Sequence, residues 1–128
     1  MPQESTLLRY LPSILFSVAL NASAQLFLRK GLANLSLTMP NGGRAALETL
    51  LAIFNWGVIL GLTCYAVSVL TWMYVLSKVQ VSIAYPFLSI GYVIVLFGGF
   101  FFFREPITVI KCIGIALICA GVVLISKV

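Results

Sequence analysis

The sequence predicts an all-α integral membrane protein, a single domain over residues 1–128 with four transmembrane helices. Hydrophobic residues make up 62% of the chain and charged residues only 9%, which is far from the composition of a soluble domain. The few charged residues separate four long uncharged apolar runs. These runs are continuously apolar rather than alternating, which favours helices over the strands of a transmembrane barrel.

The first predicted helix covers residues 10–28 and ends at the basic pair Arg29-Lys30. Its uncharged run is about 28 Å long at about 1.5 Å per residue, close to the ~30 Å of a hydrocarbon core. Ala22-Ser23-Ala24 imitates the cleavage site of a signal peptide. Because Leu26-Phe27-Leu28 continues the run to spanning length, we expect a retained first helix.

The second predicted helix covers residues 50–76 and follows the longest connection, Ala33–Glu48. This connection reads as a loop, and Met39-Pro40-Asn41-Gly42-Gly43 within it is typical of a turn. Only Lys78-Val79-Gln80 separates it from the third predicted helix, residues 82–103. This short link predicts that the second and third helices form an antiparallel hairpin.

The fourth predicted helix covers residues 107–125. Arg104, Glu105 and Pro106 interrupt the chain before it, and Pro106 suits its first turn, where the missing N–H has no partner to lose. Glu105 is expected either to cap this helix or to pair with a basic residue. In the third helix, Pro86 predicts a kink that leaves the carbonyl four residues earlier without its partner.

A polar residue recurs at every fourth position of the first helix: Ser13, Ser17, Asn21, Gln25 and Arg29. Each step advances about 40° around the helix, so the stripe winds slowly along one side. Amides in hydrocarbon need partners, so we expect this face to look into a bundle or cavity rather than at lipid. In the alternative interpretation, Asn21 and Gln25 only join helices through hydrogen bonds.

A second polar group surrounds the proline of the third helix. Tyr85, Ser89 and Tyr92 share one helical sector, where a tyrosine can bond a polar head while its ring packs on apolar chain. Tyr92 is alternatively a core residue. Trp72, near the end of the second helix, is a further binding candidate or a member of an interfacial aromatic belt.

Basic residues near helix ends are candidate phosphate ligands. Lys111 is predicted to lie at least one turn inside the fourth helix, where it either snorkels to the interface or faces a cavity. Arg29 and Lys30 form a second candidate cluster, with simple membrane anchors as the alternative. Five basic residues fall on one predicted side and three on the other, which favours cytoplasmic first and third loops and both termini outside.

Small residues indicate where helices pack. Gly57 and Gly61 form a GxxxG pattern in the second helix, and Gly114 and Gly121 lie two turns apart in the fourth. Four helices provide few walls for a polar pathway, so we predict an oligomer assembled through the fourth helix. Packing within one chain is the alternative.

Several classes of protein are disfavoured. The chain has no histidine and three cysteines, so we expect neither a metal nor a cofactor. Anchoring explains the net charge of +5, so nucleic acid is not an expected partner. No acidic residue falls in the middle of a predicted helix and no nucleophile has a neighbouring base, which argues against an enzyme and against proton-coupled cation export.

Several segments together carry a family resemblance: Ile83-Ala84-Tyr85-Pro86, Leu88-Ser89, Arg104-Glu105-Pro106, Gly114 and Ala120–Ile125. They resemble the four-helix branch of the drug/metabolite transporter superfamily. Within it, Val81–Ser89, Glu105-Pro106 and Gln25-Leu26 with basic residues just beyond are most similar to the ArnE/ArnF subunits that flip aminoarabinose-phosphoundecaprenol. The resemblance covers nearly all of the chain except Ala33–Glu48.

The small multidrug resistance exporters are more distant relatives by the same comparison. They carry an essential glutamate in the first helix where this chain has Asn21, and a tryptophan three residues after the conserved tyrosine where this chain has Leu88. These departures remove the proton-linked cation site. They leave an amide-lined groove with basic margins.

The resemblance implies a flippase subunit of the bacterial inner membrane that moves a polyprenyl-phosphate-linked sugar between leaflets, with the lipid tail left among the membrane lipids. Asn21, Gln25, Tyr85 and Ser89 would handle the sugar, and Arg29, Lys30 or Lys111 the phosphate. The resemblance also implies a homodimer or heterodimer of similar four-helix chains. Two alternatives are a small-cation exporter and a non-transporting accessory subunit of a membrane glycosyltransferase.

Overall fold

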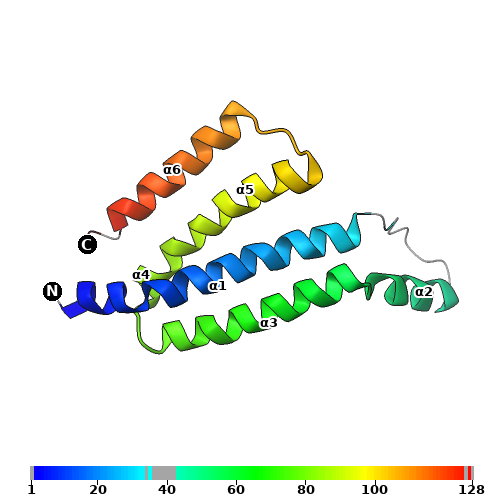
Figure 1. Ribbon diagram of the computed structural model, residues 1–128, viewed down its shortest axis with the longest axis horizontal. Coiled ribbons are helices and arrows are strands. Elements are labelled where there is room, and N and C mark those ends of the chain that lie inside the picture. Colours follow the sequence, from blue (N-terminus) through cyan, green and yellow to red (C-terminus); the bar gives the residue numbers. More distant parts are fainter. Residues whose placement is uncertain (1, 34, 36–42, 126, 128) are drawn as a thin grey trace.

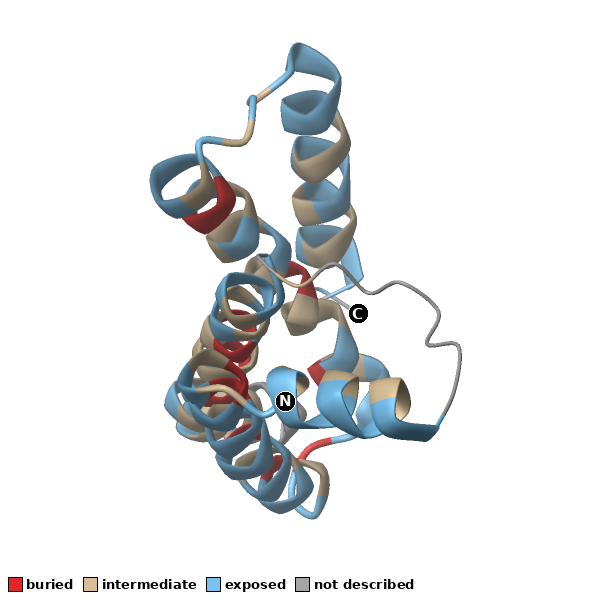
Figure 2. Cartoon of the chain, turned by 90° about the vertical axis from the view of Figure 1, so that its right-hand side faces the viewer, coloured by how far each residue is buried: buried red, intermediate tan, exposed pale blue. Residues whose placement is uncertain are grey.

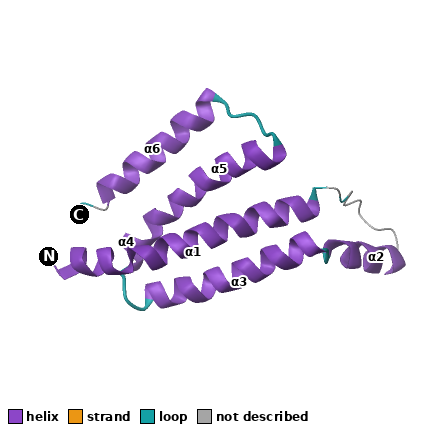
Figure 3. Ribbon diagram, viewed as in Figure 1, coloured by secondary structure: helices purple, strands orange, loops and turns teal. Residues whose placement is uncertain are grey.

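The computed structural model describes residues 2–33, 35, 43–125 and 127, and every regular element in those ranges is helical (Figure 3). Four helices dominate: α1 (Pro2–Leu32), α3 (Trp56–Leu76), α5 (Ser89–Phe103) and α6 (Val109–Ile125). Three short elements connect them: α2 (Gly43–Ile53), α4 (Val81–Ala84) and the 3-10 turn η1 (Tyr85–Leu88). The turn predicted at residues 39–43 lies, apart from Gly43, outside the described residues.

The predicted second helix is wrong as a single unit. The chain is interrupted at Phe54-Asn55, and residues 43–48, predicted as loop, begin the separate helix α2. Asn55 has an extended backbone, and its side-chain oxygen accepts the N–H of Val58 at 3.2 Å. Its amide donates to the Gly31 carbonyl of α1 at 2.7 Å. The predicted helix is therefore divided at Asn55, because this residue caps α3 and donates a hydrogen bond to α1.

The other helix boundaries also differ from the predictions. α1 begins at Pro2 rather than near residue 10. The predicted third helix is divided at Pro86 into α4, η1 and α5, so the kink is confirmed as a 3-10 turn. α6 begins at Val109 and leaves Pro106 outside its first turn, because the Thr108 hydroxyl accepts the Lys111 N–H at 3.3 Å and caps the helix there.

α1 is the central helix of the protein. α3 runs antiparallel along one side of α1, α5 packs against another, and α6 returns beside α5 (Figure 1). The short link Ser77–Gln80 is present, but α3 and α5 hardly touch, so the predicted hairpin packing of the second and third helices is wrong. Each of them packs on α1 instead.

Small residues explain why α3 packs closely against α1. A methyl group on Gly57 would lie 2.9 Å from the Cα of Gly31, and one on Gly61 would lie 3.0 Å from the Ala24 carbonyl oxygen. Ser17 and Ser68 exchange hydroxyl-to-carbonyl hydrogen bonds of 2.8 Å across the same contact. The GxxxG pattern thus packs helices within the chain, which was the alternative interpretation. Most buried residues belong to α1 and α3, and Figure 2 shows the buried positions in red.

The surface is that of a multi-pass membrane protein. Three segments are long and apolar enough to span a bilayer: Ser5–Leu32, Trp56–Leu76 and Val81–Phe103. α6 is apolar but shorter, with 17 residues. Large apolar side chains point outward from all four long helices, as lipid-facing residues do.

Candidate functional site

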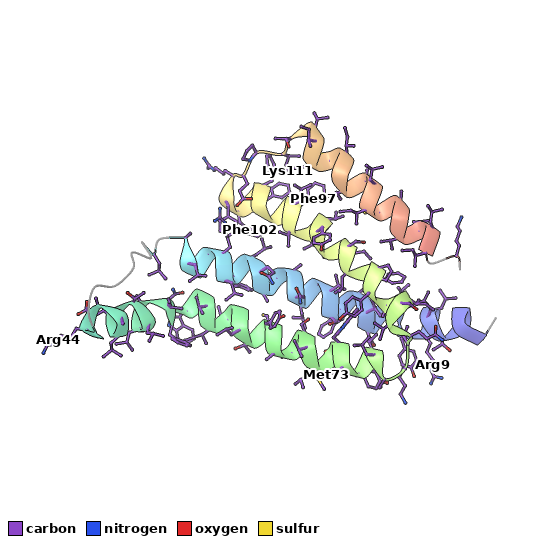
Figure 4. All side chains as sticks on the ribbon, turned by 180° about the vertical axis from the view of Figure 1, so that it is seen from behind. Arg9, Arg44, Met73, Phe97, Phe102 and Lys111 are labelled. Atoms are coloured by element: carbon purple, nitrogen blue, oxygen red, sulfur yellow. The ribbon has the colours of Figure 1, made fainter. Side chains whose placement is uncertain are left out.

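One end of the bundle collects the basic residues of the predicted site. There the C-terminal end of α1 lies beside the end of α5 and the loop that leads to α6, whereas Arg9 lies at the opposite end of the molecule (Figure 4). The predicted partition of basic residues between two sides agrees with this arrangement. Which side faces the cytoplasm stays a prediction.

A cavity of about 480 Å³ lies between α1 and α5 at this end. Its walls are mainly apolar, and its polar side chains are Gln25, Arg29 and Glu105. Gln25 and Arg29 are four residues apart in the polar stripe of α1, and both face α5. Ser17, earlier in the same stripe, faces α3, because the stripe winds around the helix. The volume is within the range of ~300–1,000 Å³ usual for small-molecule sites.

A second cavity of about 410 Å³ lies between α5 and α6. Tyr92, Glu105, Lys111 and Gly114 contribute to its walls. Lys111 is the third residue of α6, so it lies in the first turn rather than deeper in the helix. Its ammonium donates to the Pro106 carbonyl at 3.1 Å, so the side chain bends back toward the loop before α6.

Glu105 belongs to both cavities, and sequence reasoning assigned it only a structural role. Its Oε1 accepts hydrogen bonds from Nη2 of Arg29 at 2.7 Å and from Nε at 3.1 Å. The predicted pairing of Glu105 with a basic residue is confirmed. The Phe103 ring lies 5.5 Å from the Arg29 guanidinium, a distance suited to cation–π attraction.

The backbone holds Glu105 in this position. Arg104 ends α5 with a left-handed backbone, φ 53° and ψ 34°, so the chain reverses within one residue. The N–H groups of Arg104 and Glu105 both donate to the Gly99 carbonyl. The Glu105 carboxylate then lies over Gly99, where a methyl group would come within 3.1 Å of Oε2.

A third cavity, of about 640 Å³, lies at the junction of α1, α2 and α3. Lys30 lines it together with Asn55 and Trp56, neither of which the sequence analysis selected. An amide inside an otherwise apolar run was the available signal for Asn55. Lys30 is thus separated from the cavities that contain Arg29 and Lys111.

The remaining predicted residues lie elsewhere. The rings of Trp72 and Tyr85 meet edge to face at 5.7 Å, and the Ser89 hydroxyl is buried without a hydrogen-bond partner. Tyr85 lies before α5 and Ser89 is its first residue, whereas Glu105 follows its end. Because α5 has 15 residues, Glu105 is separated from Tyr85 and Ser89 by about 22 Å or more along the helix. Asn21 is half-buried in the middle of α1. The predicted residues therefore do not form one pocket.

Comparison with known proteins identifies the family of the chain. The sequence profile of the EamA-like transporter family matches residues 2–127. A probable 4-amino-4-deoxy-L-arabinose-phosphoundecaprenol flippase subunit ArnF of Pseudomonas savastanoi pv. phaseolicola is 36% identical over 119 residues, 88% of this chain and 83% of that protein.

Two other relatives align over shorter segments. The probable subunit ArnE of Pseudomonas syringae pv. syringae is 41% identical over 63 residues, and the probable subunit ArnF of Shewanella sediminis is 40% identical over 67. These alignments cover 49% and 51% of this chain, and only 58% and 46% of the relatives. No solved structure matches the chain. With the family profile matched from residue 2 to residue 127, the chain belongs to the EamA-like transporter family.

Proposed function

We propose that the chain is a subunit of a flippase that moves a polyprenyl-phosphate-linked sugar, such as 4-amino-4-deoxy-L-arabinose-phosphoundecaprenol, across the bacterial inner membrane. One observation carries the proposal: two open, mainly apolar cavities end at the basic side chains Arg29 and Lys111. An amphiphile with an anionic phosphate beside a long apolar tail has the chemistry that such cavities accept. The names of the relatives support the same substrate class.

The parts of the substrate would meet different residues. Arg29 or Lys111 would hold the phosphate at the surface, and Gln25 and Tyr92, which line the same cavities, would bind sugar hydroxyls. Lys30, in the third cavity, would add positive charge nearby. Asn21 lies farther into the bundle, and Trp72, Tyr85 and Ser89 lie toward its other end. These four residues would therefore contact the sugar only as it crosses. The polyprenyl tail would stay in the bilayer.

The working unit in this proposal is a dimer of similar chains with four transmembrane helices each. α6 would supply the fourth span, and the face that carries Gly114 and Gly121, which borders the α5–α6 cavity, would meet the partner. The relatives are named as subunits, which supports an assembly of more than one chain.

Binding in nanodiscs tests the proposal. Native mass spectrometry of the purified protein should show undecaprenyl-phosphate sugars retained over ordinary phospholipid. Arg29→Ala and Lys111→Ala should each lower sugar-lipid translocation in proteoliposomes without altering the assembly. Arg9→Ala, which removes a basic residue at the opposite end, is the matched control (Figure 4).

Other outcomes would favour the alternatives. Retention of a lipophilic cation instead of the sugar-lipid would favour a small multidrug resistance type of exporter. That exporter would need to work with Asn21 where those proteins have glutamate. Retention of neither ligand, with a stable glycosyltransferase partner, would favour an accessory subunit.

A further inference from the structure

We infer that Glu105 is a built-in counter-ion that the substrate phosphate displaces from Arg29, and that Lys111 receives the displaced carboxylate. The inference rests on the proposed function and adds to it a residue that decides when the phosphate binds. It starts from one conflict: the side chain best placed to bind a phosphate already binds a carboxylate.

The conflict is geometric. A guanidinium binds a phosphate best through two parallel N–H groups on one edge. In Arg29 the edge formed by Nε and Nη2 is used by Glu105 Oε1, at 3.1 and 2.7 Å. Phe103 lies near the guanidinium, with its ring centre 5.5 Å away. A phosphate that binds Arg29 through this edge must therefore displace Glu105.

The ion pair is suited to exchange. The two side chains are 58% and 41% exposed, and exposed pairs of this kind contribute only about 0–1 kcal/mol. The carboxylate itself is well placed, because the left-handed residue Arg104 and the contact with Gly99 direct it toward α1. Glu105 thus occupies the phosphate position without closing it permanently.

A second cation lies on the other side of Glu105. Lys111 lines the α5–α6 cavity together with Glu105, and its ammonium, which has three N–H donors, is bonded to the Pro106 carbonyl. Rotation of the Glu105 side chain from the α1–α5 cavity into the α5–α6 cavity would exchange Arg29 for Lys111. Each anion, the phosphate and the carboxylate, would then have its own cation.

The exchange would also change how the helices are joined. The Arg29–Glu105 pair ties the C-terminal end of α1 to the loop between α5 and α6, residues that are 76 positions apart in the sequence. When phosphate replaces Glu105, this tie is lost. Binding of the headgroup would therefore release the α5–α6 loop from α1.

Binding of undecaprenyl phosphate in nanodiscs tests the inference with a charge-matched control. Glu105→Gln should tighten binding about fivefold, since it removes the competitor at a cost of about 1 kcal/mol. Glu48→Gln removes a carboxylate of α2 that lines neither cavity, and it should leave the affinity unchanged. In an Arg29→Gln background, Glu105→Gln should have no effect. Lys111→Gln should weaken binding only while Glu105 is present.

A distance measurement tests the release of the loop without any ligand. Nitroxide labels on Ala33 and Val109, in a chain with its three cysteines replaced, report on the separation of α1 from the start of α6. Glu105→Gln should lengthen and broaden this distance, as undecaprenyl phosphate should in the wild type.

The two failures are distinguishable. Wild-type protein that retains undecaprenyl phosphate, with equal or weaker binding by Glu105→Gln, would overturn the role of Glu105 and leave the flippase proposal intact. Unchanged label distances in Glu105→Gln would overturn the release of the loop. Absence of selective retention by the wild type would count against the flippase itself.

Discussion

Arg104 is the one non-glycine residue with positive φ among the residues that the structure describes. Its left-handed backbone costs a residue with a Cβ about 1–2 kcal/mol. Arg104→Gly should therefore stabilise the protein by about 1 kcal/mol, measured by unfolding in mixed SDS micelles. Arg104→Ala removes the same charge but keeps the Cβ, so it should give no such gain. Equal stability of the two variants would contradict the argument.

Ser17 and Ser68 form a buried pair in the contact between α1 and α3. Each hydroxyl donates to the other residue's carbonyl at 2.8 Å, and both side chains are 2% exposed. Hydrogen bonds between membrane helices contribute about 0.6 kcal/mol on average and rarely more than ~1.7. Ser17→Ala and Ser68→Ala should each cost about 1 kcal/mol, and the double variant should cost less than their sum. If the double variant instead cost the sum of the two single variants, the two hydrogen bonds would be independent, contrary to the prediction.

At the scale of helices, two glycine positions should respond differently to alanine. A methyl group on Gly57 would meet the backbone of Gly31 at 2.9 Å, whereas one on Gly114 meets nothing within 4 Å. Gly57→Ala should destabilise the fold by about 1–3 kcal/mol because the backbones must separate. Gly114→Ala should be neutral or slightly stabilising. Fluorescence of Trp56 and Trp72, both on α3, follows the unfolding.

α2 has one apolar and one polar face, and its leucines have no cover from the described part of the chain. Leu47 and Leu50 are 58% and 54% exposed, and Leu50 lies about 120° and 160° around the helix from Arg44 and Glu48. Such a helix lies in the interface with its apolar face in the headgroup region. Trp56, directly after it, is 78% exposed at the expected depth of an aromatic belt.

Spin labels can locate this helix in nanodiscs. Labels at Leu47 and Leu50 should be accessible to dissolved oxygen, and labels at Arg44 and Glu48 to a water-soluble nickel chelate. Nickel access at all four positions would place α2 in water, contrary to the prediction.

The helices also show what a sequence pattern predicts well. Apolar length located the long helices, and Pro86 correctly predicted a local break, because the missing N–H acts wherever proline stands. Asn55 was missed because its effect depends on a neighbour: its amide bonds to the Gly31 carbonyl of another helix. A residue whose role depends on a distant partner has no local signature.

At the scale of the whole molecule, α6 is the least packed of the four long helices. None of its described residues is buried, and Gly114 and Gly121 lie on one open face. If α6 forms the dimer contact that we propose, Gly114→Leu with Gly121→Leu should convert a two-chain mass into a one-chain mass in nanodiscs. Ala116→Leu, a similar enlargement on the opposite face of α6, should leave the dimer intact. A single-chain mass for the wild type would refute the dimer.

The candidate site could be predicted only in part. The sequence supplied Arg29, Lys111, Gln25 and Tyr92, and the structure places all four in the two cavities that share Glu105. Ser89 lies one turn from Tyr92, but Ser89 and Tyr85 lie about 22 Å or more along the helix from Glu105. Periodicity says which residues share a face of one helix, but it does not say at which level two helices meet.

The sequence by itself determined the helical membrane class, the apolar runs and the residues that interrupt them, because the length of an apolar run and the placement of charge are local properties of the chain. Only the tertiary structure decided that α1 lies between α3 and α5, that the GxxxG glycines face α1, and that Glu105 pairs with Arg29. These choices depend on how small residues let particular backbones approach, and on contacts between residues up to 76 positions apart.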